Sequence, residues 1–276
     1  MVRYSVLMSV YHKEKAEYFE AAMLSMLNQS CPPDEFVLVC DGPLTKELDE
    51  VIDRITGKYN DLFVVLRLEH NKGLGIALQQ GLRKCTNEIV ARMDSDDIAM
   101  PFRMKLQTEF LESNPHISVV GGQISEFCGK EDNIIGYRKV PLSCDDVKNT
   151  VADRCPMNHM TVTFRKSAVE AVGSYVDFKL LEDYHLWSRL IANGYNICNL
   201  DEVLVNARVD ENMYKRRGGI NYYRQIYALE KFLFKIGISS RVRCIKNIVL
   251  RFCAVVLVPN CLRSLFYNKL LRSKQK

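Results

Sequence analysis

The sequence predicts an α/β protein with a Rossmann-like, mostly parallel sheet flanked by helices, followed by a helical, basic C-terminal tail. Short apolar, partly β-branched runs alternate with stretches of helical hydrophobic spacing. The connections between them are short, which favours a parallel sheet with helices on both faces. Several apolar runs end in acidic or glycine-rich turns, and ligands of such sheets bind outside the carboxyl ends of the strands.

The first third of the chain alternates strands and helices regularly. Pro32 and Pro33 end the first predicted helix, and Thr45 is a candidate N-cap for the second. Asn71 to Gly75 forms a glycine turn that leads into the third helix. The predicted strands are 4–11, 35–40, 62–68 and 89–93, and the predicted helices are 17–29, 45–55 and 76–85.

The remaining pattern is less regular. A helix at 101–113 is expected to stop before Asn114 and Pro115. The turn-rich segment 129–140 predicts a hairpin or excursion, and 206–219 predicts a loop. The other predicted elements are strands at 117–122 and 160–165, one or two strands within 196–205, and helices at 145–153, 167–173, 181–193 and 220–236.

Positive charge is concentrated at the C-terminus. The 276 residues carry a net charge of +5, yet residues 231–276 contain eleven Lys or Arg and no Asp or Glu. Within this tail, the apolar run 248–258 is too short to span a membrane. Basic residues beside an apolar segment favour an anionic membrane surface as the partner, and packing on the core or on a second subunit is the alternative. No aromatic-and-basic recognition module appears, so we expect no nucleic-acid partner.

Cysteine usage indicates a reducing compartment. The ten cysteines form no Cys-x-x-Cys pair, and the first residues do not have the pattern of a signal peptide. We therefore expect a cytoplasmic protein, held peripherally on the inner face of a bacterial membrane if the tail binds lipid.

Three carboxylates follow the predicted strand 89–93. Asp94, Asp96 and Asp97 would repel one another unless a cation lies among them. Oxygen ligands suit Mn²⁺ or Mg²⁺, which often share them with substrate phosphates. The pattern therefore predicts a metal–diphosphate site, with an acidic turn before the next helix as the alternative.

Two further turns lie at predicted strand ends. Asp41 follows the second strand in Asp41-Gly42-Pro43, where it is either a ligand contact or a turn residue. The turn from Asn71 to Gly75 opens a helix, whose N-terminus favours anions. It is neither a P-loop nor a dinucleotide fingerprint, because Leu78 occupies the third glycine position.

Two acids, Glu182 and Asp183, shortly precede the single tryptophan, Trp187, in the stretch that begins at Leu181. Acids are favoured in a first helical turn, so a helix start is the plain interpretation. The functional interpretation is a general base, since transfer of a sugar to a hydroxyl needs a group that accepts the hydroxyl proton.

Several spaced motifs occur together in one order. They are Ser5 to Tyr11, Cys40-Asp41-Gly42, Asn71 to Gly75 with Ala77 and Gly81, Asp94-Ser95-Asp96-Asp97, and Glu182-Asp183-Tyr184 with Leu186-Trp187. This order resembles family 2 glycosyltransferases of the GT-A fold, and most closely the capsule, exopolysaccharide and O-antigen branch that includes amylovoran-type enzymes. The resemblance covers roughly residues 4–217. It implies a GT-A nucleotide-sugar domain at 1–217. The charge pattern described above makes 218–276 a helical, basic region that is expected to associate with a membrane.

The resemblance also implies roles for single residues. Asp183 would be the catalytic base of an inverting, hexosyltransferase-type reaction, and Asp96 would bind Mn²⁺ or Mg²⁺. Asp41 would contact a base, expected to be uracil, and Asp94 the ribose side. The implied donor contacts are Ser9, Tyr11, Asp41, Asn71, Gly73, Asp94 and Arg208, and the implied acceptor or supporting residues are Glu182, Trp187, His159 and Asp97. The partners would be a UDP-sugar donor and a glycan or lipid-linked acceptor.

The sequence departs from the family pattern at two motifs. Cys40 replaces the first of two acids at the end of the second strand. Relatives often carry Arg-x-His where this chain has Arg208-Val209-Asp210, so the role of Asp210 is open, and Arg216 and Arg217 are further candidates to close over the diphosphate. Arg92, inside the fourth predicted strand, is a candidate buried partner for an acid.

Three other function classes fit the sequence less well. An Asp-x-Asp phosphotransferase would place its nucleophile after the first strand, where this chain has Tyr11-His12. A nucleotidyltransferase would need a glycine-rich loop with Arg at that point. An inactive nucleotide- or carbohydrate-binding module would not require the acids at 94, 96 and 183. The donor sugar, acceptor and linkage depend on pocket shape, which single residues do not reveal.

Overall fold

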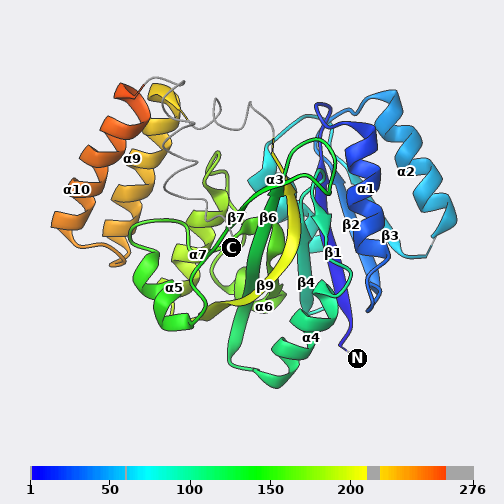
Figure 1. Ribbon diagram of the computed structural model, residues 1–276, viewed down its shortest axis with the longest axis horizontal. Helices are drawn as coiled ribbons and strands as arrows, with labels where there is room; N and C mark the ends of the chain where they lie inside the picture. Colours follow the sequence, from blue (N-terminus) through cyan, green and yellow to red (C-terminus); the bar gives the residue numbers. More distant parts are fainter. Residues whose placement is uncertain (1, 60, 210–217, 259–276) are drawn as a thin grey trace.

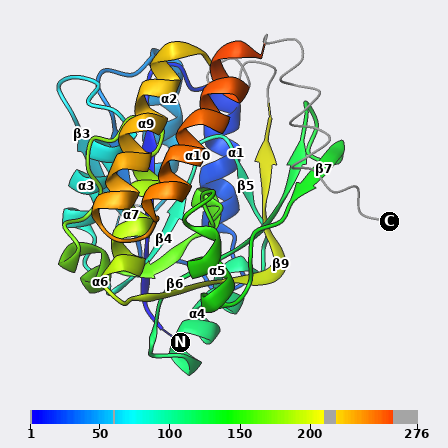
Figure 2. The ribbon, with the colours of Figure 1, turned by 90° about the vertical axis from the view of Figure 1, so that its left-hand side faces the viewer.

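The computed structural model describes residues 2–59, 61–209 and 218–258 (Figure 1). Within them, nine strands form one sheet in the order β3-β2-β1-β4-β8-β6-β9-β5, and β7 pairs with β6. Helices cover both faces of this sheet (Figures 1 and 2). The predicted fold class is therefore confirmed.

The N-terminal half is the parallel part of the sheet. β1 pairs with β2 and β4, and β2 pairs with β3, all in parallel register. These elements match the predictions to within a few residues. They are β1 (Tyr4–Val10), α1 (Ala16–Leu27), β2 (Glu35–Cys40), α2 (Lys46–Lys58), β3 (Phe63–Arg67), α3 (Leu74–Lys84) and β4 (Ile89–Met93).

The second half is mixed. β8 runs antiparallel to β4 and β6, whereas β6 and β9 are parallel, and the β6–β7 hairpin confirms the prediction for 129–140. The elements are β5 (Ile98–Ala99), α4 (Arg103–Ser113), β6 (Ile117–Phe127), β7 (Ile134–Arg138), α5 (Cys144–Thr150), the 3-10 turn η1 (His159–Thr161), β8 (Thr163–Arg165), α6 (Lys166–Ala171), α7 (Glu182–Ala192) and β9 (Asn196–Arg208).

Two local predictions were wrong, and one short strand was missed. β9 is one strand that continues to Arg208, because its end pairs with β6 up to Phe127, so residues 206–208 are not loop. The two-residue strand β5 was not predicted, and it exists by pairing with β9. The first half of the predicted strand 160–165 is a 3-10 turn.

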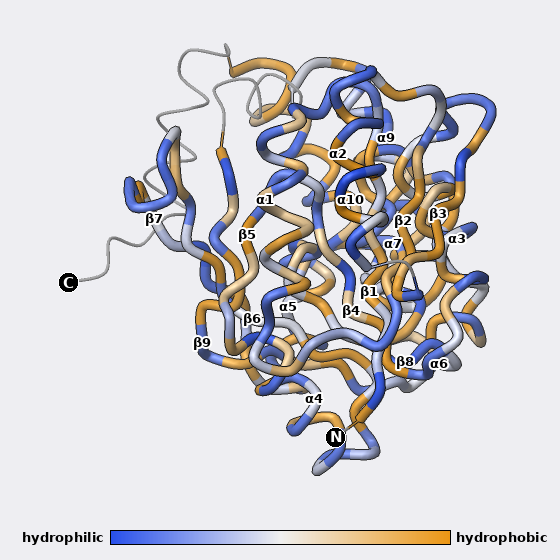
Figure 3. Tube along the Cα trace, turned by 90° about the vertical axis from the view of Figure 1, so that its right-hand side faces the viewer, coloured by the Kyte–Doolittle hydropathy of each residue, from blue (hydrophilic) through white to orange (hydrophobic). Residues whose placement is uncertain are grey.

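Apolar side chains fill both faces of the sheet. One cluster joins alternate residues of β1, β2 and β4 to α1, α2 and α4, and the other joins the opposite faces to α3, α6 and α7. Figure 3 shows hydrophobic stretches along these central strands. The packing is close: a Cβ at Gly81 of α3 would lie 2.5 Å from Leu7 Cδ1 and 2.6 Å from Val39 Cγ2. These contacts fix α3 against the sheet and so fix the glycine turn that precedes it.

Two helices and a π-helical turn follow the sheet. They are α9 (Gly219–Lys235), α10 (Arg241–Phe252) and η2 (Cys253–Leu257). α9 packs on α7, where the Phe232 ring stacks on His185 with centroids 4.0 Å apart, and α10 lies on the outer side of α9 (Figure 1). In the described part of the chain, no helix combines the length and apolarity needed to cross a bilayer. The division of the chain at residue 217 stays a prediction.

Candidate active site

The acidic cluster lies directly after β4. One carboxylate oxygen from each of Asp94, Asp96 and Asp97 lies within 4.8 Å of the others. Burial, followed by the charges of Asp94 and Glu14, raises the pKa of Asp96 to about 7. Burial and the charge of Asp96 raise the pKa of Asp97 well above its usual range. Crowded carboxylates with raised pKa values suit a hard divalent cation, because its positive charge stabilises their ionised forms.

Arg208 closes one side of this loop. Its backbone N–H donates to Asp97 Oδ1 at 2.7 Å, and its Nε donates to the Asp96 carbonyl at 3.0 Å. Its guanidinium stacks 3.7 Å from the Tyr18 ring centroid. Asp97 therefore attaches the 94–97 loop to the end of β9, and the Arg208 side chain hydrogen-bonds to the backbone of that loop. Contact between Arg208 and a diphosphate stays a prediction, and Asp210, Arg216 and Arg217 lie outside the described residues.

Asp41 fixes the glycine turn. Its carboxylate accepts hydrogen bonds from the backbone N–H groups of Lys72, at 2.7 Å, and Gly73, at 3.0 Å, while Asn71 Nδ2 donates to its carbonyl. Gly73 has φ +85°, which glycine adopts without strain. Asp41 therefore stabilises the glycine turn at 71–75, whereas the turn role expected from the sequence was within Asp41-Gly42-Pro43. Each oxygen keeps a second lone pair, so contact with a nucleotide base stays a prediction.

Ser9 and Tyr11 lie at the same edge of the sheet as Asp41. Ser9 is half-buried near the end of β1, in register with Val39 of β2. Tyr11 directly follows β1 and is 38% exposed, and the Asp41 N–H donates to the Val10 carbonyl at 2.8 Å. Ser9 and Tyr11 therefore lie at the carboxyl ends of the same strands as Asp41, and their contact with a donor stays a prediction.

The second acidic pair begins α7. Asp183 Oδ1 accepts the backbone N–H of Tyr184 at 2.7 Å, and the Cys155 thiol lies 3.6 Å from Asp183 Oδ2. Glu182 is buried, and burial with the charge of Asp183 raises its pKa to about 7. Asp183 is therefore the more accessible acid of the pair, with its carboxylate oriented by a backbone N–H and a thiol.

The glycine turn and α7 meet at Gly75. A Cβ there would lie 2.2 Å from the Val176 carbonyl oxygen and 3.4 Å from Glu182 Cβ. The charge of Asp94 acts on the pKa of Glu182, and the charges of Asp94, Glu182 and Asp183 all act on the pKa of Tyr175. The acids after β4 and those of α7, distant in sequence, therefore lie within electrostatic range of one another.

His159 and Trp187 lie in the supporting layer behind these acids. Trp187 is fully buried and the His159 ring meets it edge-on, with centroids 5.9 Å apart. His159 Nε2 is hydrogen-bonded to the Tyr175 hydroxyl at 3.0 Å, and burial holds its pKa well below the usual range. The sequence left two roles open for His159 and Trp187, contact with the acceptor or support of the site. Their buried positions favour support.

The sequence did not single out several residues of this region. Glu14, in the loop after β1, accepts a hydrogen bond from Ser95 Oγ at 2.8 Å and adds a fourth acid near Asp96. Arg103, fully buried, donates to the Arg92 carbonyl at 2.8 Å. Cys155 is distant from Asp183 in the sequence, and the two side chains come into contact only in the folded protein. None of the three stands in a recognisable motif, so no local pattern would have found them.

Arg92 is the buried cation beside the cluster. Its side chain is 2% exposed and its Nη2 donates to Asp94 Oδ1, as weighed from the sequence. We expect Arg92→Met to cost about 2 kcal/mol of unfolding free energy, because Asp94 would lose its partner in a poorly solvated place. Arg67→Met is the matched control. Its exposed pair with Asp49 should matter by less than about 0.5 kcal/mol in the same urea titrations. Equal losses in the two variants would show that the burial of Arg92 is irrelevant.

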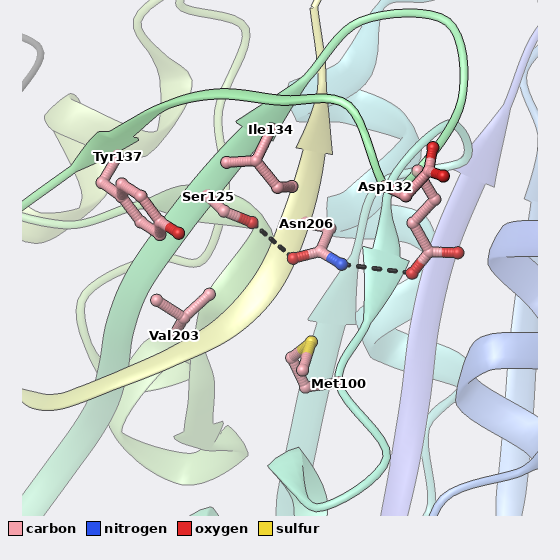
Figure 4. Close-up of a pocket in the computed structure, with 8 residues that line it drawn as sticks. Met100, Ser125, Asp132, Ile134, Tyr137, Val203 and Asn206 are labelled. Carbon is pink, nitrogen blue, oxygen red and sulfur yellow. Dashed lines mark hydrogen bonds between the residues drawn. The ribbon is translucent and has the colours of Figure 1, made fainter. Parts of the chain in front are cut away.

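A cavity of about 700 Å³ lies between the β6–β7 hairpin and β9 (Figure 4). Asn206 lies in its wall, accepts a hydrogen bond from Ser125 Oγ and donates to Glu131 at 3.1 Å. Asn206 of β9 pairs with Ile98 of β5, the residue that follows Asp97. None of the residues predicted from sequence lines it. The lining residues are Met100, Ser125, Glu131, Asp132, Ile134, Tyr137, Val203 and Asn206.

The family model described as "Glycosyl transferase family 2" matches residues 5–173. The chain belongs to glycosyltransferase family 2. The resemblance seen in the sequence is thereby confirmed, as is the transferase class.

Curated relatives of this family 2 glycosyltransferase match over most of its length. An uncharacterized glycosyltransferase of Haemophilus influenzae is 38% identical over 96% of this chain and 98% of its own. The amylovoran biosynthesis glycosyltransferase AmsE of Erwinia amylovora is 39% identical over 85% and 88%. The UDP-Gal:alpha-D-GlcNAc-diphosphoundecaprenol beta-1,3-galactosyltransferase of Escherichia coli is 34% identical over 98% and 97%.

Solved structures of low sequence identity share the fold. TarS of S. aureus (residues 1–349) in complex with UDP-GlcNAc has a TM-score of 0.67 at 18% identity, over 98% of this chain and 76% of that one. The mannosyltransferase PcManGT of Pyrobaculum calidifontis, in complex with GDP-Man and Mn²⁺, has a TM-score of 0.63 at 18% identity, over 99% and 76%. The glycosyltransferase domain therefore has the GT-A fold.

Proposed function

We propose that this family 2 enzyme transfers a sugar, with inversion, from a UDP-sugar to a hydroxyl of a lipid-linked or glycan acceptor in bacterial surface polysaccharide synthesis. The observation that carries the proposal is that the acids after β4 and the acids of α7 lie within range of one another's charge. The Asp94–Asp97 cluster suits a cation-bound diphosphate, and Asp183 on α7 suits a proton acceptor.

The relatives support the choice of donor and acceptor. The E. coli relative is named for UDP-Gal and a diphosphoundecaprenol acceptor, and it aligns over 98% of this chain. One structural neighbour was solved with UDP-GlcNAc and another with GDP-Man and Mn²⁺. A UDP-sugar, a divalent cation and a lipid-linked acceptor are therefore the first combination to test here.

Different side chains of this protein would have separate roles in an in-line displacement. Asp183 takes the proton of the acceptor hydroxyl, while the Tyr184 N–H and the Cys155 thiol orient its carboxylate. Asp96 would hold Mn²⁺ or Mg²⁺, which when bound neutralises charge on the leaving diphosphate, and Asp94 would contact the ribose side. Asp41 holds the glycine turn against which the nucleotide would lie. A single displacement inverts the anomeric carbon and needs no covalent nucleophile.

The alternatives make different predictions in one assay. We expect UDP release from one member of a UDP-sugar panel when Mn²⁺ and an undecaprenyl-diphosphate-linked sugar are supplied together. A phosphotransferase would release inorganic phosphate or phosphorylate an acceptor, and an inactive binding module would bind nucleotide without turnover. Nucleotide binding that ignores Mn²⁺, with no UDP release from any donor, would contradict the proposal.

The thiol at position 155 tests how Asp183 is positioned. We expect Cys155→Ala to lower kcat about threefold to tenfold with little change in the donor KM, because the thiol contacts the proposed base and not the donor. Cys155→Ser should restore most of the rate, since a hydroxyl also donates a hydrogen bond. Cys85→Ala, at a buried cysteine within α3's packing, controls for loss of a buried thiol as such. Equal rates for the alanine and wild-type enzymes would remove Cys155 from the mechanism.

A further inference from the structure

The helix α10 is attached to the protein by polar contacts and presents apolar side chains to the outside. On its inner side Cys244 and Asn247 are buried, and Asn247 Nδ2 donates to the Ala152 carbonyl at 2.9 Å and to Glu230 at 3.4 Å. Arg251 pairs with the same buried glutamate at 3.4 Å. Polar contacts therefore fasten this helix to α9 and to the segment after α5.

The outward side of α10 is aliphatic. Val242 is 79% exposed, Ile245 55%, Val249 54% and Leu250 55%. Because Val242, Ile245 and Val249 recur at intervals of three and four residues, they share one face of the helix, opposite the buried residues, and Leu250 lies at the edge of that face. We call these four residues the aliphatic stripe. Leu257 in η2, 63% exposed, extends the apolar surface past the end of the helix.

Basic residues border the stripe and interrupt it: Lys246 lies four residues after Val242 and three before Val249, on the same face. Arg241, Arg243 and Lys246 of α10 are all exposed, and only Arg243 has an ion-pair partner among the described residues, Asp153 at 3.4 Å. No acid occurs in the sequence after Glu230. Apolar side chains bordered by cations form the surface that an anionic bilayer binds, because the aliphatic groups enter the acyl boundary while the cations meet the headgroups.

A second copy of the chain fits this surface less well. In a two-fold contact made through the stripe, Lys246 of each copy would approach its own equivalent, and α10 carries no acid to pair with it. An apolar surface of this kind needs a partner, and an anionic lipid surface matches its charge.

We propose that the aliphatic stripe of α10 docks this enzyme on an anionic phospholipid surface. α10 covers α9, which packs directly on α7, so docking would hold the helix that bears Asp183 at a fixed distance from the membrane (Figures 1 and 2). A lipid-linked acceptor would then meet the base without leaving the bilayer. Docking itself does not depend on the identity of the donor.

The test uses the full chain and sedimentation with vesicles. Wild type should bind phosphatidylglycerol–phosphatidylcholine vesicles and should bind pure phosphatidylcholine vesicles weakly. The double variant Ile245→Glu/Val249→Glu should lose at least about tenfold in partitioning, because both changes place charge on the stripe without touching the core. The matched control is Ile135→Glu/Leu142→Glu, which charges two exposed apolar residues elsewhere, 42% and 40% exposed, and should bind like wild type.

Two results would overturn the proposal. Unchanged vesicle binding by the α10 variant would exclude the stripe as the docking surface. A concentration-dependent dimer of the wild type that the α10 variant abolishes, with no binding of either protein to vesicles, would assign the stripe to a second copy. UDP binding with Mn²⁺ in the absence of vesicles should be equal in all variants. Its loss in every protein would contradict the proposed function and leave the docking result intact.

Discussion

Replacing Asp183 by Asn is expected to abolish sugar transfer while leaving UDP binding intact. The amide keeps the size of the carboxylate and still accepts the Tyr184 N–H bond, but it cannot take a proton from the acceptor hydroxyl. Loss of a general base costs a factor of about 10² to 10⁴ in kcat. The measurement is kcat for UDP release with saturating donor and acceptor, together with calorimetric titration of UDP.

Glu182 provides the neighbouring control. Because its pKa is raised to about 7, it already holds a proton for much of the time near neutral pH. Glu182→Gln mimics that protonated form, so its rate should fall by far less than that of Asp183→Asn. Normal turnover by Asp183→Asn would refute the assignment of the base, and a larger loss in Glu182→Gln would transfer that role to Glu182.

Replacing Asp96 by Asn should remove the dependence of nucleotide binding on metal. In wild type we expect Mn²⁺ to tighten UDP binding at least about tenfold, because the cation bridges the carboxylate and the diphosphate. Asp96→Asn should bind UDP weakly and equally with and without Mn²⁺. Asp201→Asn, at an exposed acid of β9, should behave like wild type in the same titrations.

The same substitution should change the stability of the metal-free protein. Folding raises the pKa of Asp96 from 3.8 to about 7, so the folded state binds more protons than the unfolded state between those values. Stability should therefore fall as the pH rises through that range, and Asp96→Asn should flatten the fall and raise Tm at neutral pH. A lower metal-free Tm in Asp96→Asn would show that the carboxylate stabilises the fold without a cation.

The sequence allowed the parallel half of the fold to be predicted, because its signals are local. β1, β2 and β4 are buried on both faces and therefore read as continuous apolar runs. The turns that follow them carry the acids and glycines in short motifs. Asp41 and the cluster after β4 could thus be singled out from local motifs, whereas the choice of Asp183 over Glu182 came from the family resemblance.

The second half depends on contacts between distant residues. β5 has only two residues and the last part of β9 is polar, and both are strands because each pairs with a partner far along the chain. Cys155 reaches Asp183 across twenty-eight positions, and Glu14 reaches Ser95 across eighty-one. Hydrophobic periodicity contains no information about such pairs, which is why these residues were missed.

The C-terminal tail was also predictable only in its local features. Its basic charge and apolar run were visible in the sequence, whereas the side of α10 that faces outward was not. The buried Glu230 decides that orientation, because it draws Asn247 and Arg251 inward and leaves the aliphatic stripe outside.

The most direct test of the central claim is a crystal structure of the enzyme with UDP and Mn²⁺. The account predicts that the cation binds an Asp96 carboxylate oxygen together with the diphosphate, and that the Asp183 carboxylate opens onto the same cavity as the bound nucleotide. Nucleotide bound away from Asp96, or an Asp183 carboxylate that faces a different surface, would contradict it.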